Sequence, residues 1–139
     1  MKKLSIALLA LALAALAFAA CATGPVSIPN TLSPSELIQR AQEASDRNRY
    51  NHALQYYEAL LERNRDNIDL VCTAEYEIAF IHYKQKKYNW SKIEFYSLLE
   101  RYNGEGGEYL PPQFKLLALK VLEQIEEKEQ PRSLSRKDR

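Results

Sequence analysis

One stretch of the chain occurs twice, and this repeat predicts the fold. Residues 50–63 read YNHALQYYEALLER, and residues 88–101, which begin 38 positions later, read YNWSKIEFYSLLER. A repeat of this period is typical of stacked supersecondary units, none of which can bury its apolar face alone. We therefore expect a helical-repeat protein. Such proteins usually hold other proteins and do not transform substrates.

The residues around the repeat predict five helices and no strand. Ser33, Pro34 and Glu36 form a helix start signal, a Ser-x-x-Glu capping box with proline at the first helical position. The later helices follow from apolar residues that recur every three or four positions. The expected helices cover residues 34–47, 51–63, 70–86, 88–103 and 111–129.

The last of these helices is expected to close the stack. Its expected buried face consists of Phe114, Leu117, Ala118, Val121, Leu122 and Ile125. Lysines and glutamates occupy the opposite face, as in an amphipathic helix. We expect this helix to cover the exposed side of the last repeat, which is the task of a terminal cap.

The N-terminus has the pattern of a secretion signal. Lys2 and Lys3 precede an uncharged apolar stretch over residues 6–18, which two alanines follow. The stretch is shorter than the roughly 20 apolar residues that span a membrane. The run Phe-Ala-Ala-Cys over residues 18–21 resembles a bacterial lipobox, which implies cleavage before Cys21 and acylation of its thiol. A secreted protein with an incidental cysteine is the alternative.

These patterns predict four segments. They are a lipoprotein signal peptide over 1–20, a flexible lipid-anchored tether over 21–34, a repeat domain over 35–129 and a disordered basic tail over 130–139. The tether is expected because its glycine, prolines and serines show no periodicity, and the tail because it is basic and almost free of apolar residues. The net charge is +1, and loss of the two signal-peptide lysines would bring it to about −1. A near-neutral exported chain is not expected to bind nucleic acid.

The chain shows no pattern of catalytic or metal-binding residues. With Cys21 acylated, Cys72 has no partner for a disulfide and is expected to act as a small buried apolar residue, with a reactive thiol as the alternative. His52 and His82, the two histidines, have no cysteine or carboxylate at metal-ligand spacing. The glycines in residues 104–107 lack the pattern of a phosphate loop. We expect no catalysis, no cofactor and no metal.

The repeated positions resemble those of tetratricopeptide repeats. In that family a small residue on helix A is followed nine positions later by an aromatic residue. A small residue on helix B lies twelve positions after the first, with an aromatic four beyond it. Here these positions hold Ala41, Tyr50, Ala53 and Tyr57, and again Ala79, Tyr88, Ser91 and Phe95. The resemblance covers residues 35–103, with a period of 38 where about 34 is usual.

The resemblance implies an all-α fold, a short right-handed α-solenoid of two helix pairs and a C-terminal capping helix. With the lipobox, the chain resembles tetratricopeptide-repeat lipoproteins of bacterial envelopes. Ala22 follows the cysteine where an acidic residue would signal retention in the inner membrane. The implied role is a non-catalytic adaptor, lipid-anchored to the outer membrane and facing the periplasm, which binds another envelope protein during complex assembly.

In this family a partner lies on the concave wall made by helix A. Carried over by position, that wall consists of Ile38, Gln42, Ser45, Thr73, Tyr76, Phe80, Tyr83 and Lys84. Spacings of four and three place Tyr76, Phe80 and Tyr83 on one helix face. A row of aromatic rings suits an extended segment or the side of a partner helix. The alternative is that the fifth helix or a crossing loop covers these rings as core.

Two other functions remain open from the sequence. The row of Tyr76, Phe80 and Tyr83 could form a pocket for a small hydrophobic ligand or a lipid. Alternatively, a structural envelope protein could contact peptidoglycan or anionic lipid through the basic tail.

Overall fold

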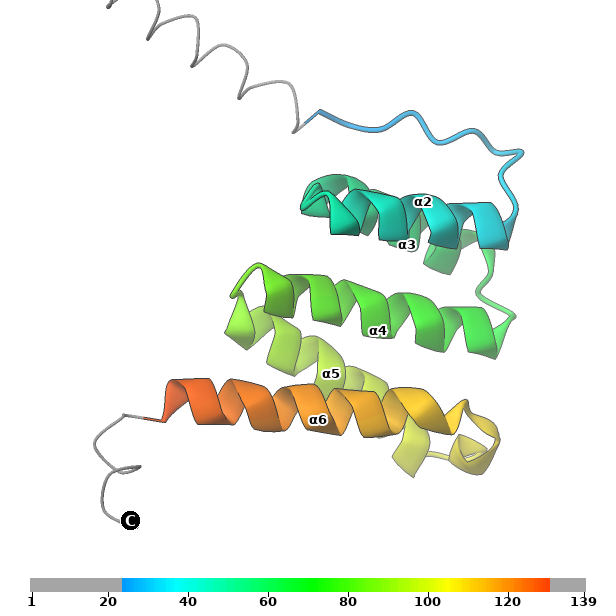
Figure 1. Ribbon diagram of the computed structural model, residues 1–139. Helices are drawn as coiled ribbons and strands as arrows, with labels where there is room; N and C mark the ends of the chain where they lie inside the picture. The colour runs from blue at the N-terminus through cyan, green and yellow to red at the C-terminus, as the bar shows by residue number, and fades with distance from the viewer. Residues whose placement is uncertain (1–23, 131–139) are drawn as a thin grey trace, which may run out of the picture.

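A computed structural model describes residues 24–130 of the chain, and this part is all-helical (Figure 1). Its elements are α2 (Pro34–Asp46), α3 (Tyr50–Arg63), α4 (Ile68–Lys84), α5 (Tyr88–Asn103), the short 3-10 helix η2 (Gly107–Tyr109) and α6 (Pro112–Glu129). No strand occurs within the described range, so the predicted all-α class is confirmed. The predicted signal peptide, Cys21 and residues 131–139 lie outside the described residues.

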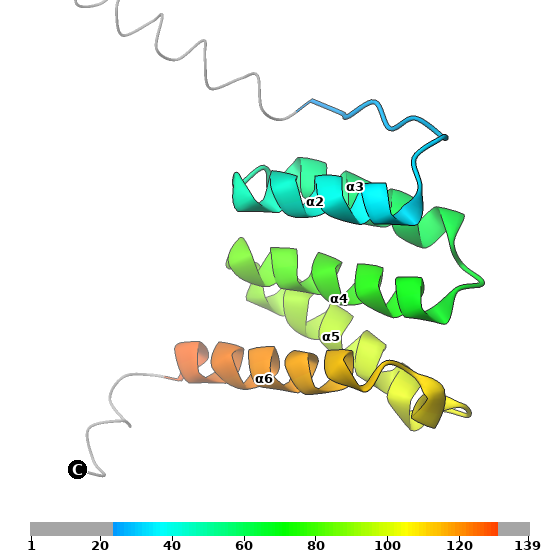
Figure 2. The same cartoon turned by 45° about the vertical axis from the view of Figure 1, so that its right-hand side comes forward.

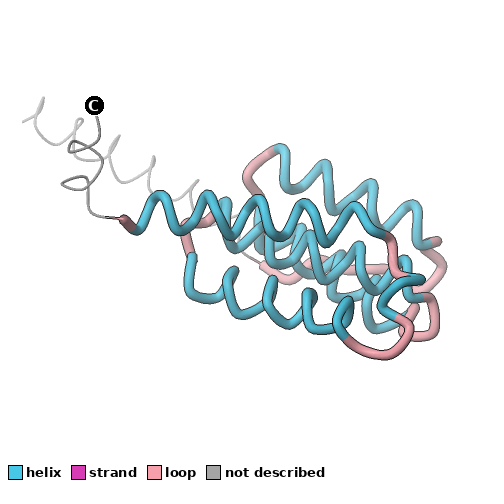
Figure 3. Tube along the Cα trace, turned by 90° about the horizontal axis from the view of Figure 1, so that it is seen from below, coloured by secondary structure: helices cyan, strands magenta, loops and turns pink. Residues whose placement is uncertain are grey.

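The helices form a short stack of two layers. Helices α2, α4 and α6 lie in the front layer, and α3 and α5 lie behind them (Figures 1 and 2). Each helix packs on the next one along the chain, and α6 also contacts α4. Seen from below, α6 is the element nearest to the viewer (Figure 3). This is the helical-repeat, solenoid-like arrangement that the repeat predicts.

The repeat in sequence is also a repeat in backbone conformation. Asn48 and Lys86, which are 38 positions apart, both have a left-handed backbone, with φ of 56° and 61°. In each case the next N–H group donates to the carbonyl five positions back, at 2.8 and 2.9 Å. The chain therefore turns from the first to the second helix of each pair in the same way.

The starts of two helices follow from their caps. Glu36 N–H donates to Ser33 Oγ at 3.3 Å and Ser33 N–H donates to Glu36 Oε2 at 2.8 Å, so the predicted capping box is confirmed. The Ser33 hydroxyl donates to Glu36 Oε2 at 2.7 Å, and this bond, together with that from the Ser33 N–H, holds the pKa of Glu36 below its ordinary value. The side chain of Asn67 caps α4 by accepting from Leu70 N–H at 3.2 Å. As a result α4 begins at Ile68, two residues before the predicted start.

Two apolar clusters hold the stack together. The first joins α2, α3 and α4, and the second joins α4, α5 and α6. Six of the eight repeat positions lie at their centres and are at most 1% exposed, namely Ala41, Ala53, Tyr57, Ala79, Ser91 and Phe95. Small residues let the paired helices approach closely, and the large rings fill the space between successive pairs.

The fifth predicted helix is confirmed, but one residue of its expected buried face is not buried. Ala118, Val121, Leu122 and Ile125 are buried and Phe114 is partly buried, whereas Leu117 is 41% exposed. Leu117 lies about 100° round the helix from Ala118, away from the seam with α5. The neighbouring leucines Leu116 and Leu119 are exposed as well.

The prediction of a flexible tether over 21–34 is wrong for residues 26–32. This segment, the N-terminal strap, lies over the end of the stack that α2 and α3 form (Figures 1 and 2). Three of its side chains pack against the first cluster, namely Val26, Ile28 and Leu32. Val26 N–H donates to Gln55 Oε1 at 2.8 Å, and the Arg63 guanidinium donates to the carbonyls of residues 28 and 29 at 3.2 and 3.1 Å. The folded domain therefore begins near residue 26.

Candidate partner-binding site

The eight residues predicted to bind a partner lie on two neighbouring helices of the front layer. Ile38, Gln42 and Ser45 come from α2, and the other five come from α4. Gln42 is exposed, and five are partly buried, namely Ile38, Thr73, Phe80, Tyr83 and Lys84. We call this side of α2, α4 and α6 the helix-A face.

A row of stacked aromatic rings runs along α4 on this face. The Tyr76 and Phe80 rings are 5.8 Å apart and the Phe80 and Tyr83 rings 5.7 Å apart, with interplanar angles of 15° and 17°. Phe114 of α6 continues the row at 5.5 Å from Tyr76, and Tyr88 of α5 lies 6.0 Å from Tyr83. These centroid distances are in the range where aromatic pairs attract each other.

Helix α6 covers one end of the row, which corrects part of the predicted site. Tyr76 is 7% exposed and packs against Phe114, so it belongs to the core and is not available to a partner. Burial raises the pKa of Tyr76 to about 12. The sequence-based alternative, that the fifth helix covers the rings, therefore holds for Tyr76. Phe80 stays partly exposed next to it.

Helix α6 also engages Tyr83 at the other end of the row. The Tyr83 hydroxyl donates to Gln124 Oε1 at 3.0 Å and accepts from Lys128 Nζ at 2.7 Å. The Lys128 ammonium lies 5.0 Å from the centre of the Tyr83 ring. Sequence reasoning missed Gln124 and Lys128, although both continue the stripe of Phe114, Leu117 and Val121 at spacings of three and four.

Lys84 ties the two helix pairs together on the same face. Its ammonium lies 5.2 Å from the Phe80 ring centre and 5.5 Å from that of Tyr50, and it donates to Ser45 Oγ. Ser45 is 8% exposed, so its predicted contact with a partner is wrong: it orients Lys84. Within residues 24–130, neither Lys84 nor Lys128 has a carboxylate within ion-pairing distance.

Glu77 is a further charged group of this face that sequence reasoning missed. It is partly buried on α4, one turn from both Thr73 and Phe80. Burial raises the pKa of its carboxyl, and the nearby Lys84 ammonium opposes part of this change. A partly buried, ionised carboxylate lowers the stability of the fold. A hydrogen-bond donor from a partner could offset this cost by binding Glu77.

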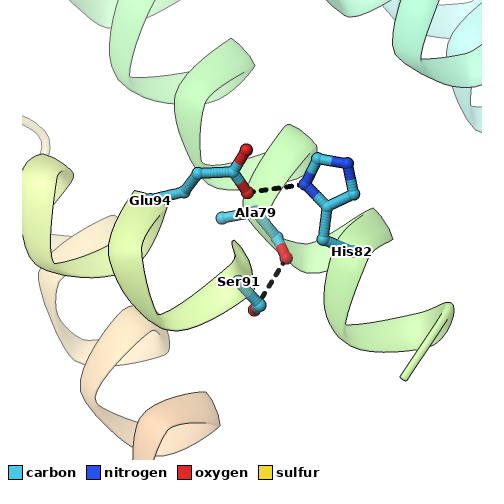
Figure 4. A network of polar contacts seen from close by, with 4 residues as sticks. All are labelled: Ala79, His82, Ser91 and Glu94. Carbon is cyan, nitrogen blue, oxygen red and sulfur yellow. Dashed lines mark hydrogen bonds and ion pairs between the residues drawn. The ribbon is translucent and has the colours of Figure 1, made fainter. Parts of the chain in front are cut away.

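Polar side chains of α4 and α5 contact one another where the two helices pack (Figure 4). His82 Nδ1 lies 2.7 Å from Glu94 Oε2, and Ser91 Oγ donates to the Ala79 carbonyl at 2.9 Å. The His82 side chain is 16% exposed. These contacts join the two helices of the second pair.

A cleft of about 560 Å³ lies elsewhere on the stack. It is lined by Glu58, Leu61, Glu62, Arg65, Ile68, Val71, Glu75 and Arg101. Arg101 donates to both carboxylate oxygens of Glu75, at 2.6 and 2.8 Å. No ring of the aromatic row lines this cleft.

The free cysteine of the described residues lies in the second apolar cluster. Cys72 is fully buried, and burial raises the pKa of its thiol. No three His, Cys, Asp or Glu side chains between residues 24 and 130 lie where they could share a metal ion. None of the helices in this range is both long and apolar enough to cross a membrane.

Comparison with known proteins gives one relative of undetermined role. An uncharacterized protein of Treponema pallidum (strain Nichols) is 33% identical to the chain over 107 residues. The match covers 76% of this chain and 43% of the relative, so the chain spans less than half of that protein's length. No family model and no solved structure matches the chain.

Proposed function

We propose that this protein is a non-catalytic, lipid-anchored adaptor of the bacterial cell envelope that binds a segment of another envelope protein on its helix-A face. The observation that carries the proposal is Phe80, which stays partly exposed at the centre of a stacked aromatic row. Rings that are already stacked lose little conformational freedom on binding, which favours their use as anchors.

The groups around Phe80 suit a polypeptide partner. Exposed Gln42 and 41% exposed Leu117 come from the helices on either side of α4. Thr73 and Glu77 add a hydroxyl and a carboxylate on α4 itself. An apolar centre with polar groups at its edges is the usual make-up of a protein-binding surface. The resemblance to tetratricopeptide repeats supports the same side of the helices.

The anchor follows from the lipobox resemblance at Cys21. Because the strap packs on the domain from Val26 onward, about five residues link the lipid to the fold, and an extended chain of that length spans roughly 17 Å. The adaptor would therefore sit close to the bilayer, with the strap-covered end nearest to it. We propose the periplasmic side of the outer membrane, because the residue directly after Cys21 is Ala22 and not an acidic residue.

Photo-crosslinking in living cells tests the binding face. A photoreactive residue replaces Gln42 on the helix-A face or, as the control, exposed Glu58 on α3. We expect Gln42 to capture a discrete second protein and Glu58 to capture none. Adducts from Glu58 alone would place the partner at the cleft on the back of the stack and would contradict the proposal.

A second variant separates binding from folding. Phe80→Ala should remove the adduct captured from Gln42 while the helical circular-dichroism signal stays unchanged. Loss of the helical signal would identify Phe80 as a core residue. Capture at the original level with intact folding would exclude Phe80 as the anchor.

A further inference from the structure

The C-terminal end of the stack exposes large apolar side chains. Ile93 and Tyr96 of α5 are 63% and 50% exposed, and Leu116 and Leu119 of α6 are 69% and 47% exposed. We call these four residues the C-terminal end face. A terminal repeat unit normally has a polar outer side, which keeps the stack soluble. Exposed apolar residues gathered on two adjoining helices therefore indicate an interaction surface.

The four residues lie on adjoining helices, beside the seam where those helices pack. Tyr96 directly follows buried Phe95, and Leu119 directly follows buried Ala118. A step of one residue is a rotation of about 100°, and because α5 and α6 run antiparallel, equal steps turn both side chains to the same side of the seam. Helix α6 is the last layer of the described stack, so no described element covers this side (Figures 1 and 2).

The charges on α6 are arranged to match a second copy of the same helix. Its first half carries Lys115 and Lys120. Its second half carries Glu123, Glu126 and Glu127, together with Lys128 and Glu129, which bind Tyr83 of α4 and Lys92 of α5. When two such helices run antiparallel, the basic half of each lies against the acidic half of the other. A two-fold contact requires self-complementarity of this kind.

We propose that a second copy of this chain binds the C-terminal end face through a two-fold contact. In this dimer the two α6 helices run antiparallel, Leu119 lies near the symmetry axis, and Lys115 of each copy faces Glu123 of the other. The apolar residues of α5 and α6 from both copies form the centre of the contact.

The opposite end of the stack argues against head-to-tail association. A chain of copies would need the C-terminal end face of one to bind the α2–α3 end of the next. The strap packs its apolar residues on that end, and Arg63 holds it in place. The apolar surface that can pair with one C-terminal end face is therefore the same face of another copy. A two-fold contact uses this face on both copies, so the assembly is a dimer and not a chain.

This surface differs from the proposed adaptor site. Leu117 continues the stripe of Phe114, Gln124 and Lys128, which contact the aromatic row of α4. Leu119 lies two positions along the same helix, about 160° away round its axis. The two leucines are 41% and 47% exposed, so they form a matched pair for testing the two surfaces separately.

Cysteine crosslinking of the full chain in cells tests the dimer. Leu119→Cys and Leu117→Cys are each treated with a short thiol-to-thiol crosslinker, and both keep the native Cys21 and Cys72. We expect a product of twice the chain mass from Leu119→Cys and none from Leu117→Cys. Equal yields from the two positions, or no dimer from Leu119→Cys, would overturn the proposal.

Charge reversal then tests the antiparallel arrangement. In the Leu119→Cys chain, Lys115→Glu places like charges together at two symmetric points, which we expect to weaken the dimer by about tenfold. Adding Glu123→Lys restores opposite charges and should restore the crosslinking yield. A yield that Lys115→Glu leaves unchanged, or that Glu123→Lys fails to rescue, would overturn this arrangement. Loss of an adduct from Gln42 would affect only the adaptor proposal.

Discussion

The two halves of the stack are built from the same repeat but end differently. The first half is closed by the strap, which packs on α2 and α3. The second half ends with α6, whose outer side exposes leucines. The interior of a repeat stack is fixed by pairing between neighbours, but each end lacks one neighbour and needs a separate solution. One end is covered by the N-terminal segment, and no residue between 24 and 130 covers the other.

Residues at equivalent positions of the two repeats also make different contacts. Arg63 donates to carbonyls of the strap, whereas its counterpart Arg101 binds the carboxylate of Glu75. Tyr57 and its counterpart Phe95 are both buried, but only the tyrosine carries a hydroxyl. Such pairs allow one repeat to serve as the control for the other.

The largest expected effect on stability distinguishes the second apolar cluster from the C-terminal end face. Phe95 is fully buried and lies 5.6 Å from the Tyr76 ring. Phe95→Ala should lower the free energy of unfolding by about 3–5 kcal/mol, through lost burial and the cavity that remains. Leu116→Ala on the end face should cost less than about 0.5 kcal/mol. Urea unfolding at low protein concentration measures both, and comparable losses would mean that the end face is core.

The next effect concerns the closed end. Arg63→Ala removes the guanidinium that donates to residues 28, 29 and 30. Because these hydrogen bonds are exposed, we expect a loss of about 1–2 kcal/mol and faster amide exchange in the strap. Hydrogen-exchange mass spectrometry reads the strap directly. Arg65→Ala, two positions away, is the control and should leave exchange there unchanged. A strap that exchanges equally in both variants would contradict the assigned role of Arg63.

A smaller effect, a gain in stability, should come from giving the first repeat the phenylalanine that the second repeat has at the equivalent position. The Tyr57 hydroxyl is buried without a hydrogen-bond partner among the described residues, and burial raises its pKa. Tyr57→Phe removes this group and should stabilise the fold by about 1 kcal/mol. Thermal unfolding measures the change. A loss of stability would show that the hydroxyl has a partner and that the two repeats need different rings.

The smallest effect depends on pH and compares Glu77 with its counterpart Gln39. Gln39 is exposed, whereas burial raises the pKa of Glu77 above its ordinary value. The folded state then binds the proton more tightly than the unfolded state, so stability falls as pH rises through and above the ordinary pKa of 4.5.

Glu77→Gln should therefore raise the melting temperature near about pH 7 and give little gain near about pH 4. Melting curves of both proteins across this interval measure the difference. An equal gain at both pH values would point to altered packing in place of the ionised carboxylate.

The sequence was sufficient for features that rest on local pattern. The capping box at Ser33 and the buried small residues such as Ala41 and Ala79 were predicted because they depend on spacing within one repeat. The strap was missed because Val26 and Ile28 have no helical period, and their burial depends on a surface that only the packed helices create. Tyr76 was misjudged for a related reason, since the angle at which α6 crosses α4 is set by tertiary packing.

The candidate site was predicted in outline but not in its accessible members. Position in the repeat correctly placed Phe80 and Lys84 on the side that α2 and α4 share. It did not show that Ser45 would be buried beneath the Lys84 ammonium. Nor did position in the repeat predict that Glu77 would be partly buried on this face, because a carboxylate three positions from an aromatic residue is common on a solvent-exposed helix.

The most direct test of the adaptor function is a photo-crosslinking comparison of Gln42 and Leu119 in the same cells. Our account predicts that Gln42 captures a different protein and that Leu119 captures a second copy of this chain. The masses of the two adducts, identified by mass spectrometry, distinguish these results. A chain that yields no foreign protein from Gln42, while Leu119 still yields the dimer, would contradict the adaptor function and leave the dimer standing.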